Sequence, residues 1–165
     1  MFIGGDSIGV GGYDYAIRAD PKVFVRDDFA IGYTSSYRMG QLLRFSMVIP
    51  PIPENMDLFQ YMVTQFIEAV RKCLKEGGYA KKESETESGG EFLVGVRGRL
   101  FKIQSDYQVA ETLRPYDAAG CGEQFALSSM FTSRIKSPKN KIIKAMEAAA
   151  EFSVGVKPPY VIVSV

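Results

Sequence analysis

The stretch MFIGGDSIGVGGYDYAIRADPKVFV, residues 1–25, carries the features from which the fold can be inferred. An apolar segment runs into two glycines and ends before a carboxylate, Asp6. Sixteen residues later, Lys22 begins a second apolar segment. We interpret residues 1–5 and 22–25 as strands, because short apolar runs bounded by glycine, proline or acidic residues are typical of β-structure. Asp6 therefore stands at the tip of a strand that has no earlier strand in the sequence to pair with.

The bulk composition predicts one globular domain spanning residues 1–165. Hydrophobic residues make up 46% of the chain, charged residues 24%, and the formal net charge is +1. This balance does not favour binding to nucleic acid or to a membrane surface, since either needs a concentrated basic face. No apolar run approaches the roughly 20 residues of a membrane span, and no signal peptide is visible. Cys73 and Cys121 lie far apart, which favours a reduced, cytoplasmic protein without a metal site or cofactor.

The chain contains no histidine. This excludes Ser-His-Asp and Cys-His catalysis, and it removes the commonest zinc ligand. Any hydrolytic chemistry must use another proton acceptor, and the candidates are lysine, a carboxylate or a free α-amino group.

The remaining pattern alternates strands with pairs of helices. Residues 34–47 and 57–76 have helical spacing, and Asp57 is a suitable N-cap. The second helix carries one apolar stripe that we assign to the core, comprising Leu58, Phe59, Met62, Val63, Phe66, Ile67, Val70 and Leu74. The other expected elements are a strand at 29–33, a polar loop at 81–91, a hairpin at 92–96 and 100–104, a strand near 107–109, helices after 122 and from Pro138, and strands at 153–156 and 160–165.

This order predicts an α+β fold, a four-layer αββα sandwich with two antiparallel sheets between helix pairs. A doubly wound parallel fold would need strands and helices to alternate singly, which they do not.

Four motifs in order resemble the proteasome β-subunit family, and within it the HslV-type peptidases. They are Ile3-Gly4-Gly5-Asp6, the pair Lys22-Val23, the turn 32–36 that opens a helix, and 120–126, GCGEQFA, that opens another. The resemblance covers nearly the whole chain, and these enzymes are N-terminal-nucleophile hydrolases. In that family the nucleophile is the first residue of the mature chain, and its own α-amino group helps to accept the proton. Such chemistry agrees with the absence of histidine.

The resemblance implies a role for each matching residue. Lys22 would lower the pKa of the nucleophile, and Asp6 would orient Lys22. Cys121 stands where the family has a serine that helps to hold the nucleophile, although a thiol is a weaker hydrogen-bond donor than a hydroxyl. Ser35 would supply the oxyanion-binding N–H, with Tyr33 beside it.

Gly120 and Gly122 flank Cys121 and complete this predicted site. Without the resemblance, Asp6 would be read as a turn or cap residue, Lys22 as a solvated strand residue, and Cys121 as a small buried side chain.

The family's nucleophile lies on a strand that precedes the one ending in the aspartate. Only five residues precede Asp6, so we expect the threonine, serine or cysteine nucleophile to be encoded upstream of Met1 and the 165-residue chain to be a poor peptidase.

Three functions stay open at this stage. The first is a threonine-type endopeptidase in a homo-oligomeric ring, which takes unfolded-protein substrates from an ATP-dependent unfoldase. The second is a non-catalytic assembly subunit, for example of a phage. The third keeps the fold and hydrolyses a small amide.

Overall fold

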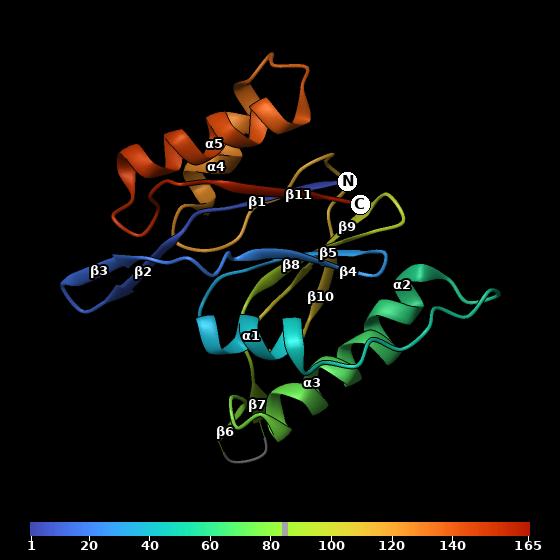
Figure 1. Ribbon diagram of the computed structural model, residues 1–165. Coiled ribbons are helices and arrows are strands. Elements are labelled where there is room, and N and C mark those ends of the chain that lie inside the picture. The colour runs from blue at the N-terminus through green and yellow to red at the C-terminus, as the bar shows by residue number, and fades with distance from the viewer. Residues whose placement is uncertain (84–85) are drawn as a thin grey trace.

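The computed structural model describes residues 1–83 and 86–165, and its elements stack in four layers (Figure 1). Helices α4 (Glu123–Thr132) and α5 (Pro138–Phe152) cover a two-stranded antiparallel sheet made of β1 (Phe2–Gly5) and β11 (Val161–Ser164). A five-stranded sheet lies beneath it, and the helices α1 to α3 cover the far side. The predicted α+β sandwich is confirmed.

The larger sheet has the strand order β10-β9-β8-β5-β4, and all its neighbouring strands are antiparallel. The strands are β4 (Val23–Arg26), β5 (Phe29–Tyr33), β8 (Phe92–Val96), β9 (Arg99–Ile103) and β10 (Val109–Glu111). The connection β8–β9 is the predicted hairpin, closed at Arg97-Gly98, where both residues have positive φ.

The two sheets pack closely around Ile3 on β1, which contacts Val23 and Ala30 of the larger sheet. Gly32 allows this approach, because a Cβ at that position would lie 2.6 Å from Cγ2 of Ile3. On the opposite side, Gly4 lies directly under Ile142 of α5. Residues 3–5 are therefore enclosed between a sheet and a helix layer, which holds Asp6 at a defined point.

The second helical region has the predicted boundaries but an irregular centre. It comprises α2 (Leu58–Tyr61), a π-helical turn (Met62–Phe66) and α3 (Ile67–Glu76), with Asp57 accepting a hydrogen bond from the Gln60 N–H. The extra residue in the π turn rotates the buried face. Tyr61 is therefore fully buried, whereas two members of the predicted stripe, Phe59 and Val63, are partly exposed.

The first helix is shorter than the expected 34–47. Helix α1 (Tyr37–Phe45) begins after Ser36, whose side chain accepts a hydrogen bond from the Arg38 N–H. The apolar residues of α1 and α3 pack against the larger sheet in the main core.

The structure differs from the elements expected from the sequence at four further segments: 8–17, 81–91, 107–109 and 153–156. The segment after Asp6 forms a hairpin, β2 (Ile8–Gly11) and β3 (Asp14–Ile17), because Gly12 adopts the positive φ of a tight turn. The expected loop 81–91 contains the strands β6 (Lys81–Glu83) and β7 (Thr86–Ser88), while residues 84–85 lie outside the described part.

An ion pair between Glu87 and Arg71 ties the β6–β7 hairpin to α3.

Residues 153–156 form a turn and not a strand, since the Ser153 hydroxyl accepts a hydrogen bond from the Gly155 N–H. The strand expected near residues 107–109 begins at Val109.

Candidate active site

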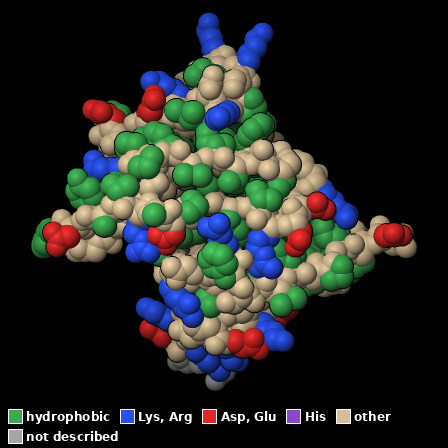
Figure 2. Space-filling view, in the orientation of Figure 1, with side chains coloured by type: hydrophobic (Ala, Val, Ile, Leu, Met, Phe, Trp, Pro, Cys, Tyr) green, Lys and Arg blue, Asp and Glu red, His purple; other side chains and the backbone are tan. Residues whose placement is uncertain are grey.

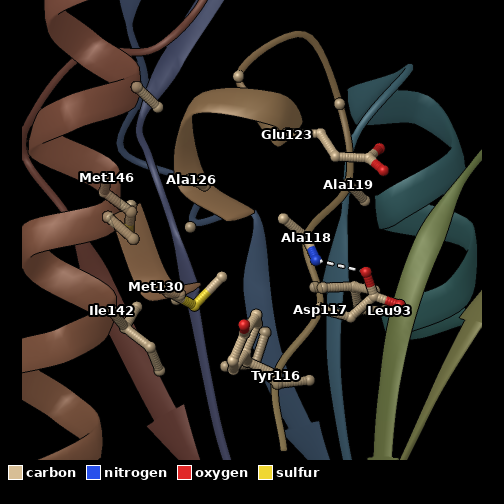
Figure 3. Close-up of a pocket in the computed structure, with 18 of the residues that line it drawn as sticks. Leu93, Tyr116, Asp117, Ala118, Ala119, Glu123, Ala126, Met130, Ile142 and Met146 are labelled. Atoms are coloured by element: carbon tan, nitrogen blue, oxygen red, sulfur yellow. Dashed lines mark hydrogen bonds between the residues drawn. The ribbon is translucent and has the colours of Figure 1, made fainter. Parts of the chain in front are cut away.

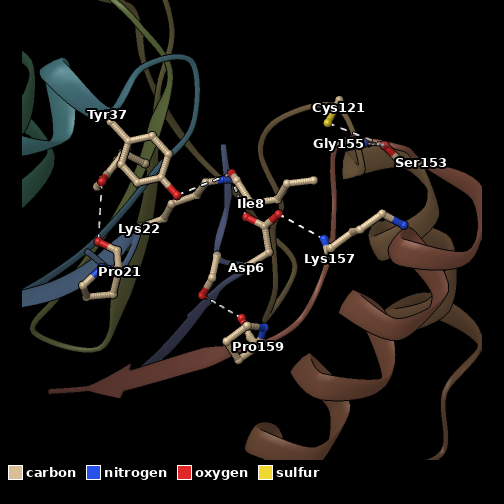
Figure 4. A network of polar contacts seen from close by, with 12 residues as sticks. Asp6, Ile8, Pro21, Lys22, Tyr37, Cys121, Ser153, Gly155, Lys157 and Pro159 are labelled. Carbon is tan, nitrogen blue, oxygen red and sulfur yellow. Dashed lines mark hydrogen bonds and ion pairs between the residues drawn. The ribbon is translucent and has the colours of Figure 1, made fainter. Parts of the chain in front are cut away.

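Asp6 and Lys22 form a direct ion pair, as the sequence predicted. Lys22 Nζ donates to Asp6 Oδ1 at 2.5 Å, a short distance of the kind found in charge-assisted hydrogen bonds (Figure 4). The Asp6 side chain is 8% exposed and that of Lys22 is 17% exposed. The pair is therefore mostly shielded from water, which strengthens the attraction between the two charges.

Backbone contacts from the C-terminal part of the chain orient Asp6. The Lys157 N–H donates to the second carboxylate oxygen at 3.3 Å, so both oxygens are engaged. The adjacent Ser7 is buried, and its hydroxyl donates to the Pro159 carbonyl at 2.8 Å. Nothing in the sequence signals these contacts, because they join residues about 150 positions apart through backbone atoms.

The Tyr37 ring lies beside the Lys22 ammonium, and Tyr33 packs against Tyr37. Its ammonium lies 5.7 Å from the centre of the Tyr37 ring, and Tyr37 makes an edge-to-face contact with Tyr33 at 5.9 Å. Burial, with a further contribution from Asp6, raises the pKa of Tyr37 to about 12. Burial also raises the pKa of Tyr33 well above its usual range. Both phenols are therefore neutral near pH 7, and sequence reasoning did not single out Tyr37.

A cavity of about 550 Å³ lies beside the ion pair (Figure 3). Residues 1–6 line it on one side, and apolar side chains of the helix layer, including Met130, Ile142 and Met146, line it on another. Within the described residues, β1 is hydrogen-bonded to another strand, β11, along one edge only. The cavity thus adjoins a strand edge with free backbone groups, which is the arrangement that accepts an additional strand.

The turn Gly120-Cys121-Gly122 lines the same cavity as Asp6, Lys22 and Tyr33. Gly120 has a φ of +96°, and a Cβ there would lie 2.7 Å from the Thr34 hydroxyl. The Gly120 turn therefore packs directly against the segment that leads into α1.

Cys121 is exposed, which corrects the expectation of a small buried side chain. Its Sγ accepts a hydrogen bond from the Ser153 hydroxyl at 3.5 Å, so the thiol is held by the 153–155 turn and not by Asp6 or Lys22.

Ser35 lies next to this assembly but does not line the cavity, whereas its neighbour Thr34 does. Ser35 has a φ of +64°, and its hydroxyl accepts a hydrogen bond from the Glu91 N–H at 3.1 Å. Among the described residues the Ser35 N–H has no acceptor. An N–H group free of structural hydrogen bonds suits the binding of an oxyanion.

The described residues contain no cluster of three side chains suited to a metal ion, and none of their helices has the length and apolarity needed to cross a bilayer. The charged groups at the end of β1 are the Asp6 carboxylate and the Lys22 ammonium, and the Ser35 N–H lies nearby. These groups can lower the pKa of a nearby hydroxyl or amine and stabilise negative charge. Lys22 makes no hydrogen bond to a hydroxyl or thiol of the described chain.

Two antiparallel sheets between helix layers are the arrangement of the proteasome-like fold. Comparison with solved structures confirms this fold. Thiobacillus denitrificans BPH in complex with epoxomicin aligns with a TM-score of 0.76 and 20% identity, covering 98% of this chain and 90% of that chain. Eukaryotic HslV from Trypanosoma brucei aligns with a TM-score of 0.64 and 15% identity over the same shares of the two chains.

The helical assembly of the Anbu complex from Pseudomonas aeruginosa gives a TM-score of 0.61 and 11% identity, covering 98% of this chain and 75% of that chain. By sequence, no protein-family model and no curated protein matches. At these identities the similarity lies in the fold, so the function has to be argued from the site.

Proposed function

We propose that this chain is a proteasome-like subunit that hydrolyses peptide bonds with an N-terminal nucleophile. The observation that carries the proposal is the shielded Lys22–Asp6 pair, which faces a cavity beside the free edge of β1. In this proposal a preceding strand adds to that edge and presents its first residue to Lys22. The ammonium lowers the pKa of the nucleophile, and the free N–H of Ser35 stabilises the oxyanion.

The test compares two forms of the protein in a fluorogenic peptide assay. One form is the 165-residue chain, and the other includes the in-frame codons upstream of Met1. We expect turnover from the longer form, and Lys22→Ala should reduce its kcat by about 10²–10⁴-fold, the usual contribution of acid–base assistance. Lys144→Ala is the matched control, because Lys144 is exposed on α5. Turnover by the 165-residue chain that is unaffected by Lys22→Ala would place the chemistry elsewhere.

A second candidate is a non-catalytic assembly subunit. It is favoured by the contacts of the Ser7 hydroxyl, next to Asp6 in the chain, and of the Cys121 thiol, whose residue lines the same cavity: Ser7 donates to the Pro159 carbonyl, and Cys121 accepts from the Ser153 hydroxyl. Absence of turnover in both forms, together with a stable oligomer, would support this alternative.

We further propose that the subunit forms a homo-oligomer in the cytoplasm and that an ATP-dependent unfoldase supplies unfolded-protein substrates. The helical assembly of the related Anbu fold supports self-association. Figure 2 shows apolar side chains gathered on the upper half of the molecule, and Phe131 and Phe152 on α4 and α5 are each 70% exposed. Light scattering tests the proposal, and a mass of 18.3 kDa at micromolar concentration would contradict it.

A further inference from the structure

Lys102 lies near the C-terminal end of β9 and binds two carboxylates at once. Its Nζ is 2.8 Å from Glu91 Oε1 and 2.7 Å from Glu123 Oε2, and its side chain is 13% exposed. Burial by itself lowers the pKa of Lys102, but the hydrogen bonds to Glu123 and Glu91 outweigh this effect and leave the pKa above its usual value. Lys102 is therefore charged and holds two segments that are 32 residues apart in the sequence.

Glu91 connects Lys102 to the segment that carries the candidate oxyanion group. The Glu91 N–H donates to the Ser35 hydroxyl at 3.1 Å, and the Glu91 carbonyl accepts from the Thr34 N–H at 3.1 Å. Because Lys102 holds the Glu91 side chain, it also restrains the Glu91 backbone, to which Thr34 and Ser35 are hydrogen-bonded.

Glu123 connects Lys102 to the opposite wall of the site. It is the first residue of α4, and its N–H donates to the Gly120 carbonyl at 3.0 Å, which closes the turn 120–123. In Figure 3 its carboxylate points away from the methionines of the cavity. Because Gly120 packs against Thr34, the two turns also meet directly.

We infer that Lys102 is a positioning residue. It sets the spacing between the Thr34-Ser35 segment and the Gly120–Gly122 turn, and so the geometry of the cavity beside Asp6 and Lys22. This inference rests on the proposed function for its catalytic meaning. The structural part of the inference does not depend on that function, because Lys102 would restrain the two turns whether or not the protein cleaves peptides. A misplacement of about 1 Å in a catalytic constellation can cost about 10²-fold in rate.

Hydrogen exchange monitored by mass spectrometry tests the positioning role in the 165-residue chain. Lys102→Met should accelerate exchange in peptides covering 33–37 and 118–123 by about tenfold, the factor expected for loss of a charged hydrogen bond. Lys102→Arg should retain most of the protection, because a guanidinium can also bind two carboxylates. Arg99→Met is the matched control, since Arg99 lies on the same strand and pairs with Glu111, away from both turns.

Two variants that each remove one of the two carboxylates bound by Lys102 keep the test decisive if Lys102→Met does not fold. Glu91→Ala should loosen only residues 33–37, and Glu123→Ala only residues 118–123. In the longer form, Lys102→Met should lower kcat by more than about tenfold and change KM little, since positioning acts on the transition state. Exchange rates equal to wild type at both turns, or equal acceleration by Arg99→Met, would overturn the inference. Altered exchange without peptide turnover in any form would refute the proposed function alone.

Discussion

Removing both members of the Asp6–Lys22 pair should destabilise the fold by much less than the sum of the two single removals. In Lys22→Met, the Asp6 carboxylate stays 8% exposed with only the Lys157 N–H as a partner. Breaking a buried ion pair from one side costs about 3–5 kcal/mol, and the residual exposure of Lys22 places our expectation at about 3 kcal/mol. Asp6→Asn keeps an acceptor for the ammonium, so we expect about 2–3 kcal/mol.

The double variant removes both charges and leaves neither unpaired. We expect it to cost about 2–3 kcal/mol, which gives a coupling energy of about 2–3 kcal/mol between the two sites. Urea unfolding followed by circular dichroism measures all four proteins, with unchanged m-values as the sign that only stability has changed.

The pair Lys144–Glu147 provides the control cycle. Its partners are 3.2 Å apart on α5 and are 61% and 49% exposed. An exposed pair of this kind should couple by no more than about 0.5 kcal/mol. If the Asp6–Lys22 cycle gave a coupling as small as that of the control, the pair would not be an effectively buried ion pair, and our account of the site would be wrong.

Three further predictions concern the cavity turn, the thiols and alkaline pH. Gly120→Ala should lower the free energy of urea unfolding by about 2–3 kcal/mol, because an alanine at positive φ is strained and its Cβ would collide with Thr34. Adding Thr34→Ala should relieve only the collision. An unchanged stability of Gly120→Ala would refute the packing described for this turn. Under native conditions a maleimide reagent should modify Cys121 and not Cys73, which is buried and whose thiol pKa is raised by burial; labelling of both at similar rates would contradict this. Burial raises the pKa of Tyr37 from 10.0 to about 12, so the folded protein holds the phenol proton more tightly than the unfolded chain does. The contribution of this proton to stability is complete below pH 10 and is lost as the pH rises towards 12. Tyr37→Phe should therefore make the unfolding free energy fall less steeply over that range, and an equal slope in both proteins would count against it.

The sequence by itself determined the layer order and the main pair of the site. Hydrophobic periodicity predicted helices at 34–47 and 57–76, because an amphipathic helix repeats its apolar face locally. The fold resemblance rested on short motifs whose spacing is also local, which is why Asp6 and Lys22 could be paired before the structure was known. Capping at Ser36 and Asp57 was predictable for the same reason, since a cap involves residues only two or three positions apart.

Only the tertiary structure decided how the site is held together. The Lys157 N–H on Asp6 and the Lys102 bridge between Glu91 and Glu123 join segments that have no periodic relation in the sequence. The π turn at Met62–Phe66 likewise changed which side of the helix is buried, although its composition carries no signal.

The polar segment 81–91 was misread as a loop because its composition favours loops, whereas a partner from elsewhere in the chain, Arg71 for Glu87, stabilises a strand there. Side-chain and backbone pairing between distant segments depends on the packed fold, and local sequence preferences contain no record of it.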